Sequence, residues 1–192
     1  MNSCLISFLS KYDTFNDEER RIIETNSLIK EYAKGEFLVR SGQIATHTYL
    51  VLQGCVRSYY LNDGNEQNTA FFTEHDIITP VSYSKNLASN YFIECLEPCI
   101  ISHGSKEKTE DFLSKHPRFS LLCHKINDAI LAQRQTSWDH FRNLSPEEHY
   151  LELTKSNPDL LKRIPQYHLA SYLGIKPQSL SRIKKRLSKQ NH

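Results

Sequence analysis

The sequence predicts an α+β protein in which a β-rich N-terminal half is followed by a long helix and a C-terminal pair of helices. Residues 35–101 hold short β-like runs separated by turn residues, which is typical of an antiparallel sandwich, roll or barrel. Helical periodicity returns after His103. Near the C-terminus, a regular spacing of small and apolar residues coincides with a concentration of basic side chains.

The composition is that of an ordinary globular protein, with 192 residues, 39% hydrophobic and 24% charged. No apolar run approaches the ~20 residues that span a bilayer, and residues 1–8 are too short and lack the basic start of a signal peptide. We therefore expect a cytoplasmic protein without a membrane partner. Its five cysteines form no Cys-x-x-Cys pair, so neither a disulfide framework nor a zinc site is predicted.

Charge is distributed unevenly along the chain. Residues 162–192 hold eight basic and no acidic side chains, whereas residues 1–161 hold 16 basic and 22 acidic ones, a net charge of −6. A basic segment on an acidic body predicts a polyanionic partner for that segment alone.

Residues 13–33 have the pattern of an amphipathic helix. Acidic residues cluster in its first turn, where they stabilise the helix dipole. Four apolar residues would form its buried stripe. They are Ile22, Ile23, Leu28 and Ile29.

The β-rich segment contains one strong hairpin signal. Residues 57–61 and 67–72 flank Asn-Asp-Gly-Asn at 62–65, and the Asp-Gly and Gly-Asn steps tolerate the positive φ of tight hairpin turns. The run at 49–52 is continuously apolar and ends at Gly54, as a strand buried on both faces would.

Three helices are predicted between His103 and residue 158. The first, residues 109–115, stops before Pro117. A long helix then covers residues 117–141, and its apolar residues follow the spacing of a coiled-coil seam. A third helix begins at Ser145-Pro146, where Glu148 completes a capping box, and it ends at Asn157-Pro158.

Residues 166–187 have the spacing of a helix-turn-helix. Two short helices that cross steeply need a small residue where they approach and a residue tolerant of positive φ in the turn. Counting from Gln166, Ala170 is fifth and Gly174 ninth, and the apolar underside continues at Leu180 and Ile183. We expect these four to form the core of the motif.

The second helix, residues 177–188, would then enter the major groove of DNA by its N-terminal end. Glutamine suits the edge of adenine and arginine that of guanine. The predicted base-reading residues are Gln178, Ser179, Ser181 and Arg182. The predicted phosphate-neutralising residues are Lys176, Lys184, Lys185 and Arg186.

The whole chain resembles the Crp/Fnr family of regulators. The resemblance rests on Lys34-Gly35-Glu36, Gly42, the run Tyr49-Leu50-Val51-Leu52-Gln53-Gly54-Cys55-Val56, and Ser179-Leu180-Ser181-Arg182-Ile183. It implies a sensor domain at 1–116 folded as a β-roll of the double-stranded β-helix (jelly-roll) type. It also implies a dimerisation helix at 117–142 and a helix-turn-helix domain at 143–192.

The same resemblance implies a homodimer bound to a roughly palindromic operator, with RNA polymerase as a further candidate partner. The dimer interface would lie on one stripe of the long helix, at Phe119, Leu122, Ile126, Ala129 and Gln133. Polar Gln133, Thr136 and Ser137 could touch an effector across that seam, but we expect them to fix its register.

The chain departs from the family where ligands bind. Residues 78–81 and 89–92 replace the glutamate and arginine that hold cyclic AMP, so we expect no cyclic AMP binding and an unknown effector. Only Cys4 lies near the N-terminus, whereas an iron–sulfur cluster needs about four thiolates, so no cluster is expected. Haem remains an open alternative, because His47, His75 or His103 could serve as its axial ligand.

The DNA-binding end also departs from the family. A β-wing usually follows the recognition helix, whereas few residues follow Leu187, so we expect its phosphate contacts to be lost. Lys176-Pro177 stands where a Ser or Thr cap is usual.

Two other functions remain open at this point. A cupin-like metal-dependent enzyme or small-molecule-binding protein would fit the nine histidines, but no His-x-His pair, His-Glu-x-x-His or Gly-x-Ser-x-Gly motif occurs. We therefore expect neither catalysis nor a metal site. A non-specific architectural DNA binder is the third alternative.

Overall fold

The computed structural model describes residues 2–85, 87–141 and 143–190. Two four-stranded sheets, both antiparallel throughout, face each other in the orders β1-β8-β3-β6 and β2-β7-β4-β5. The strands are β1 (Leu28–Tyr32), β2 (Phe37–Val39), β3 (His47–Gln53), β4 (Val56–Asn62), β5 (Asn65–Phe72), β6 (Ile77–Ile78), β7 (Phe92–Cys95) and β8 (Cys99–Ser105). The predicted α+β class with an antiparallel roll is confirmed.

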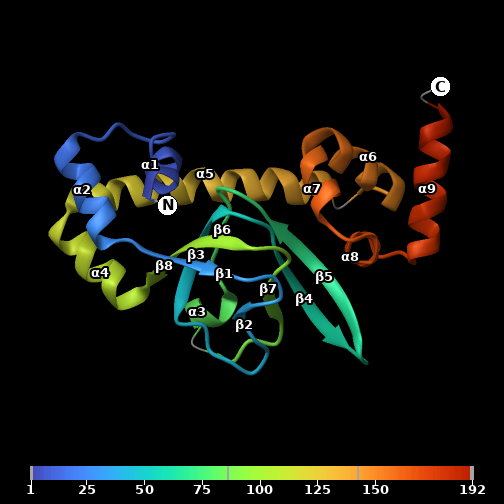
Figure 1. Cartoon of the computed structure of the whole chain (residues 1–192), viewed down its shortest axis with the longest axis horizontal. Coiled ribbons are helices and arrows are strands. Elements are labelled where there is room, and N and C mark those ends of the chain that lie inside the picture. Colours follow the sequence, from blue (N-terminus) through green and yellow to red (C-terminus); the bar gives the residue numbers. More distant parts are fainter. Residues whose placement is uncertain (1, 86, 142, 191–192) are drawn as a thin grey trace.

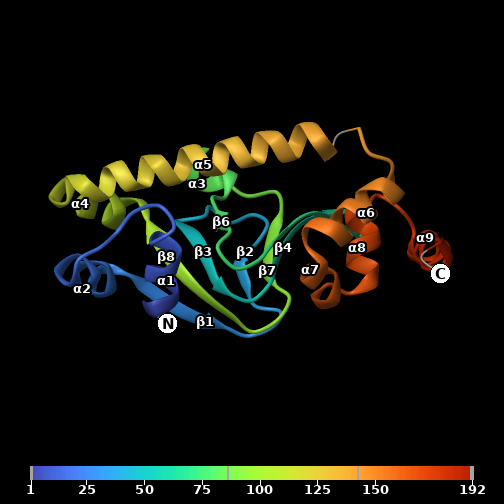
Figure 2. The same ribbon diagram turned by 90° about the horizontal axis from the view of Figure 1, so that it is seen from above.

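Helices cover the roll and extend beyond it at both ends (Figures 1 and 2). They are α1 (Asn2–Leu9), α2 (Asp17–Asn26), α3 (Val81–Lys85), α4 (Lys106–Lys115), α5 (Pro117–Phe141), α6 (Pro146–Ser156), α7 (Pro158–Arg163), α8 (Gln166–Tyr172) and α9 (Pro177–Gln190). Helix α5 runs along the length of the molecule, with α1, α2 and α4 at one end and α6–α9 at the other (Figures 1 and 2). No helix in the described ranges is both long and apolar enough to cross a membrane.

Strand β3 separates two hydrophobic cores. Its Tyr49 and Val51 side chains face the interior of the roll, and Leu50 and Leu52 face the layer of α1, α2 and α5. Both faces of this strand are therefore buried, which explains why residues 49–52 show no alternation of apolar and polar side chains.

The hairpin and the helix caps form as predicted. Strands β4 and β5 pair up to Asn62 and Asn65, and φ is positive at both Asp63 (49°) and Gly64 (77°). The capping box of α6 is present, since Ser145 Oγ accepts from the Glu148 N–H and the Ser145 N–H donates to the Glu148 carboxylate.

The single helix expected over residues 13–33 is wrong in its second half. Helix α2 begins after the cap Asn16 and ends at Asn26, and Leu28–Tyr32 forms β1, paired along its whole length with β8. Leu28 is 40% exposed rather than buried in a helical stripe. The pairing partner lies some 70 residues away in the sequence, so local periodicity carries no signal for it. Helix α1 was not anticipated.

The C-terminal helices share a hydrophobic core with the roll. Cys55, Phe71 and Leu96 of the roll pack with a set of apolar residues from α6–α8. That set includes Leu153, Leu160, Ile164, Leu169, Ala170 and Leu173. The predicted boundary near residue 142, itself outside the described residues, thus does not separate two independent cores.

Candidate nucleic-acid interface

Helices α8 and α9 form the two-helix arrangement that the spacing predicts. Ala170 is fully buried, Leu180 is 1% exposed, and Ile183 of α9 is half-buried. Gly174 in the turn has φ +68°, a conformation that side chains other than glycine rarely adopt. The turn is closed by the Ile175 N–H, which donates to Ala170 O at 3.0 Å.

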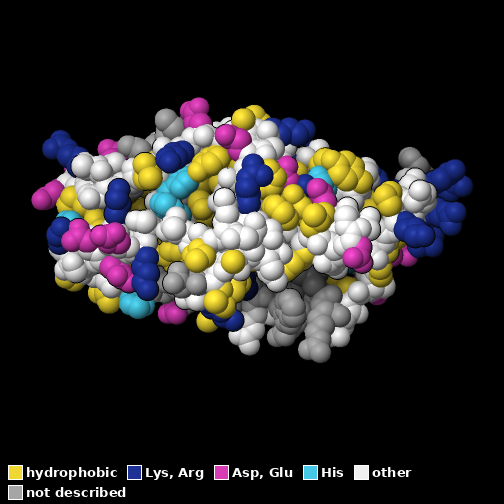
Figure 3. Space-filling model, turned by 90° about the horizontal axis from the view of Figure 1, so that it is seen from below, with side chains coloured by type: hydrophobic (Ala, Val, Ile, Leu, Met, Phe, Trp, Pro, Cys, Tyr) yellow, Lys and Arg dark blue, Asp and Glu magenta, His cyan; other side chains and the backbone are white. Residues whose placement is uncertain are grey.

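The outward face of α9 carries polar and basic side chains. Gln178, Ser181 and Arg182 are exposed, whereas Ser179 is half-buried and so less available than predicted. Four exposed cations have no ion pair or side-chain hydrogen bond within the described part of the chain. They are Lys176, Arg182, Lys185 and Lys189. Figure 3 shows Lys and Arg side chains gathered at the α9 end of the molecule.

Two predicted phosphate-binding residues instead make contacts inside the chain. Lys184 Nζ donates to Gln166 Oε1 of α8 at 3.0 Å. The Arg186 guanidinium forms an ion pair with the Glu147 carboxylate of α6. Lys184 and Arg186 therefore link α9 to its neighbours in this structure, and their role as phosphate ligands stays a prediction. Lys189, which the sequence reasoning left out, is exposed on α9.

A buried polar cluster holds α8 against the roll. Arg57 of β4 is 4% exposed, and its guanidinium donates to Glu94 Oε2 at 2.5 and 3.0 Å and to Glu66 Oε2 at 2.5 Å. The same guanidinium lies 2.8 Å from Nδ1 of His168 in α8. Asn68 Oδ1 completes the set as an acceptor at 3.2 Å. We call these five residues the Arg57 cluster.

The chemistry of the Arg57 cluster fixes the state of His168. A guanidinium has no acceptor, so Nδ1 of His168 must accept and its proton must sit on Nε2. Burial, and after it the positive charge of Arg57, lowers the pKa of His168 to about 4. His168 is therefore neutral at neutral pH. The Arg57 cluster could not be predicted from the sequence. Its members come from β4, β5, β7 and α8, which are distant from one another along the chain.

A second set of ion pairs joins α7 to the roll. Arg163 donates to the Glu74 carboxylate at 2.8 and 3.0 Å and to Glu97 Oε1 at 2.5 and 3.0 Å. Partial burial alone would raise the pKa of Glu74, but hydrogen bonds from Arg163 and from the Gly54 N–H lower it to about 2. Arg163, one of the eight cations of the basic segment, is thus a structural contact.

The interior of the roll opens to a cavity of about 300 Å³ between the strands and α5. It is lined by Ser58, Tyr60, Thr69, Ala70, Phe72, Ile78, Thr79, Val81, Tyr91, Ile93 and Arg134. Residues 78–81 and 89–92 supply no charged side chain to this lining, and the charged residue among the lining residues described is Arg134 of α5. The Arg134 guanidinium donates to Ile77 O at 2.7 Å. The Val81 N–H, at the start of α3, donates to the Tyr91 hydroxyl at 2.9 Å.

The predicted dimer stripe of α5 is only partly available. Phe119, Leu122 and Ile126 are 3–6% exposed and pack in the chain's own core against α1 and α2. They cannot also meet a second copy, which corrects their assignment. Ala129, Gln133 and Thr136 are exposed, and the side chain of Ser137 lies outside the described residues.

The candidate haem histidines have protein partners. His103 Nε2 is 2.9 Å from the Tyr32 hydroxyl, and burial lowers the pKa of His103 to about 4. His75 Nδ1 is 2.9 Å from Lys11 Nζ, and its ring stacks on Phe8. No group of three or more His, Cys, Asp or Glu side chains within the described ranges has metal-binding geometry.

Comparisons with known proteins agree with this architecture. Residues 29–116 match the family model described as "Cyclic nucleotide-binding domain". The "Fumarate and nitrate reduction regulatory protein" of Yersinia pestis is 25% identical, over 98% of this chain and 80% of the relative. The "Probable transcriptional regulator flp" of Lacticaseibacillus casei is 24% identical, over 93% of this chain and 84% of the relative.

Solved structures share the fold. FixK2 from Bradyrhizobium japonicum has a TM-score of 0.64 at 19% identity, covering 86% of each chain. The catabolite activator protein of Thermus thermophilus has a TM-score of 0.54 at 20% identity, covering 96% of this chain and 88% of the other. A β-roll, a long helix and a C-terminal helix-turn-helix thus occur in the same order here as the sequence motifs indicated. Over nearly its whole length the chain is thus similar to transcription regulators of the Crp/Fnr type, in agreement with the resemblance seen in its sequence.

Proposed function

We propose that this chain is a sequence-specific DNA-binding regulator that reads the major groove with α9. The observation that carries the proposal is the outward face of α9, where exposed Gln178, Ser181 and Arg182 lie among cations that have no ion pair with any described residue. The opposite face is fixed by buried Leu180, so the helix is held rigidly while its polar face stays free. Such a rigid mounting favours readout of base edges over loose electrostatic attachment.

Selection of bound fragments from random duplexes tests this proposal. We expect a preferred site to emerge with the natural chain. Arg182→Ala should lose the preference at one base pair, by about 1–3 kcal/mol, because a bidentate contact to guanine is removed. An architectural binder would instead enrich no sequence, and the proposal would then fail. Arg186→Ala, whose side chain is engaged by Glu147, serves as the matched control and should keep the preferred site.

The functional unit is a homodimer joined along the exposed face of α5. On that face Leu121 and Leu131 are 66% and 67% exposed. They lie on an exposed stripe with the 3-4 spacing of a coiled-coil seam, whose other positions are His124, Asp128 and Gln135. Two copies joined there would present two α9 helices to the half-sites of a palindromic operator.

Leu131→Glu tests the dimer seam by replacing one of its two leucines with a charged side chain. Sedimentation should show that the natural chain is dimeric and that the variant dissociates at micromolar concentrations. Ala129→Glu, on the stripe beside the seam, is the control and should remain dimeric. Equal behaviour of the two variants would place the seam elsewhere.

The roll cavity does not bind a cyclic nucleotide in the manner of the cyclic AMP-binding members. Its lining residues in the described part of the chain include no carboxylate to hold a ribose hydroxyl. The Val81 N–H could donate a hydrogen bond to a bound anion, but it already donates to the Tyr91 hydroxyl. Calorimetric titration with cyclic AMP should therefore give no saturable heat. A saturable signal that Arg134→Ala removes would overturn this conclusion. We also propose that no iron–sulfur cluster, haem or metal is bound, which absorption spectra and metal analysis test.

A further inference from the structure

A second cavity lies outside the roll, between the β1-β8-β3 face and the helices α1, α2, α4 and α5. Its volume is about 470 Å³, within the ~300–1,000 Å³ of small-molecule pockets. It is separate from the roll cavity, because the two are lined by different residues on opposite faces of the β1-β8-β3-β6 sheet. Nothing in the regulator function proposed above requires it.

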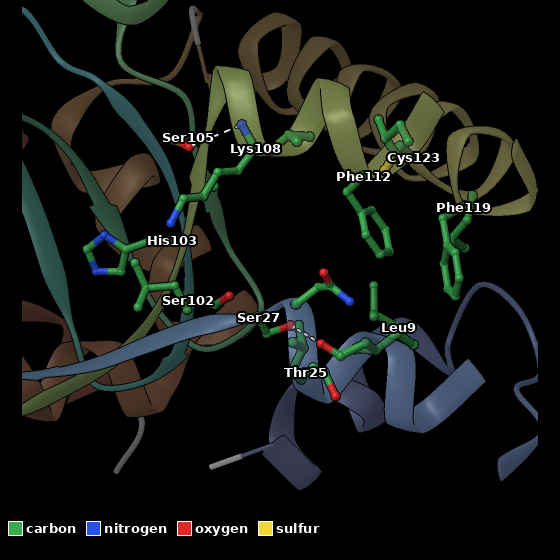
Figure 4. Close-up of a pocket in the computed structure, with 18 of the residues that line it drawn as sticks. Leu9, Thr25, Ser27, Ser102, His103, Ser105, Lys108, Phe112, Phe119 and Cys123 are labelled. Carbon is green, nitrogen blue, oxygen red and sulfur yellow. Dashed lines mark hydrogen bonds between the residues drawn. The ribbon is translucent and has the colours of Figure 1, made fainter. Parts of the chain in front are cut away.

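The lining of this cavity is amphipathic. Its deep part is apolar and comes mainly from Leu5, Leu9, Phe112, Phe119, Leu122 and Ile126. Its other end carries Lys108 of α4 with Ser102, His103 and Ser105 of β8. Figure 4 shows Lys108 of α4 reaching toward His103 and Ser102, while Phe112 of the same helix and Phe119 of α5 lie toward the other end of the cavity.

The polar end has a positive potential. Lys108 is the charged residue among the lining residues, and neither an aspartate nor a glutamate is among them. Its ammonium forms no ion pair within the described residues. Burial, together with the positive charges of Lys30 and Lys108, lowers the pKa of the neighbouring His47. His103 is neutral at neutral pH, and its Nε2 is already hydrogen-bonded to the Tyr32 hydroxyl. Among the described residues, the hydroxyl groups of Ser102 and Ser105 and the ammonium of Lys108, which has no ion pair there, therefore lie at the polar end.

We propose that this cavity binds an amphipathic carboxylate, a single anionic head on an apolar body of the size of a medium-chain fatty acid. The head would meet Lys108 and the hydroxyl groups of Ser102 and Ser105, and the chain would lie along the apolar helices. The volume of about 470 Å³ suits a ligand of small-molecule size, and a ten-carbon chain is the probe used in the test below.

Calorimetric titration of the full chain with decanoate, decan-1-ol and decylammonium tests the inference. We expect decanoate to bind saturably, decanol more weakly, and decylammonium weakest. Lys108→Gln should weaken decanoate about tenfold, the loss of one hydrogen bond to a charged head, and leave decanol unchanged. Lys106→Gln, on the same helix but outside the cavity, is the control and should bind as the natural chain does. Equal effects of the two substitutions, or tighter binding of decylammonium, would overturn the inference.

Cysteine alkylation locates the ligand independently of affinity. Cys123 lines the cavity, whereas Cys4 is exposed on α1 outside it. Bound decanoate should slow alkylation of Cys123, measured by mass spectrometry, and leave Cys4 as the internal reference. Unchanged alkylation of Cys123 at saturating decanoate would show that the ligand binds elsewhere and would refute the proposed site. Neither experiment involves DNA, so its failure is distinct from failure of the regulator function.

Discussion

The Arg57 cluster makes a quantitative prediction about how the C-terminal helices are held. Arg57→Met removes the guanidinium but keeps most of the aliphatic volume. Glu94, only 17% exposed, then loses its partner, as does the acceptor nitrogen of His168. Removing one member of a buried ion pair costs about 3–5 kcal/mol, and the 40% exposure of Glu66 places the expected loss near the lower end, about 3 kcal/mol. For a chain of this size that lowers Tm by about 6–12 °C.

Chemical denaturation of Arg57→Met and Glu94→Gln, singly and combined, measures this loss as a double-mutant cycle. We expect the double variant to be less destabilised than the sum of the two single variants, because their shared contact is lost only once. Glu66→Gln, whose carboxylate lies at the exposed rim, should cost no more than about 1 kcal/mol. If Arg57→Met left the free energy of unfolding unchanged, the Arg57 cluster would not stabilise the packing of α8 against the roll.

Three further predictions concern single residues. In the unfolded chain a histidine has a pKa near 6.5, whereas in the folded chain the pKa of His168 is about 4. Between these two pH values the unfolded state therefore binds more protons than the folded state. The free energy of unfolding falls as the pH drops through this range. The natural chain should lose about 2 kcal/mol more than His168→Gln between pH 7 and pH 5, and parallel stability curves would contradict this. Gly54→Ala should cost at least about 2 kcal/mol, because φ is +108° and the new Cβ would lie 2.8 Å from Pro98 O and Cys99 Cα. Gly64→Ala also has positive φ, but nothing lies within 4 Å, so a loss as large as that of Gly54→Ala would refute the steric explanation. Lys185→Ala should weaken binding to every duplex and flatten the log–log salt dependence by about 2 in a dimer, whereas Lys184→Ala should change it less.

Local signals in the sequence predicted the local elements well. The Asp63-Gly64 turn, the Ser145 capping box and the Ala170–Gly174 spacing each depend on neighbouring residues, and each forms in the structure. Elements that depend on distant partners were wrong or missed. Strand β1 forms because β8 provides its backbone hydrogen-bond partners. No residue near Leu28 in the sequence indicates this pairing.

Only part of the candidate site could be predicted, because the rest depends on contacts between residues that are distant in the sequence. Periodicity located a buried stripe on α5, but it could not tell whether a second copy or the chain's own α1 and α2 cover Phe119 and Leu122. The positive charge of the C-terminal segment was evident from the sequence. Which cations stay free depends on partners such as Glu147 and Gln166, which only the folded chain brings within reach.

Fluorescence anisotropy over a range of salt concentrations measures whether α9 binds duplex DNA. Each of two protomers has four exposed cations on or beside α9 without an ion pair among the described residues, which predicts tight binding of the selected duplex at low salt and a slope of log affinity against log salt of about −7. The same duplex with its preferred bases scrambled should bind more weakly at every salt concentration. No binding to any duplex at low ionic strength would contradict the account.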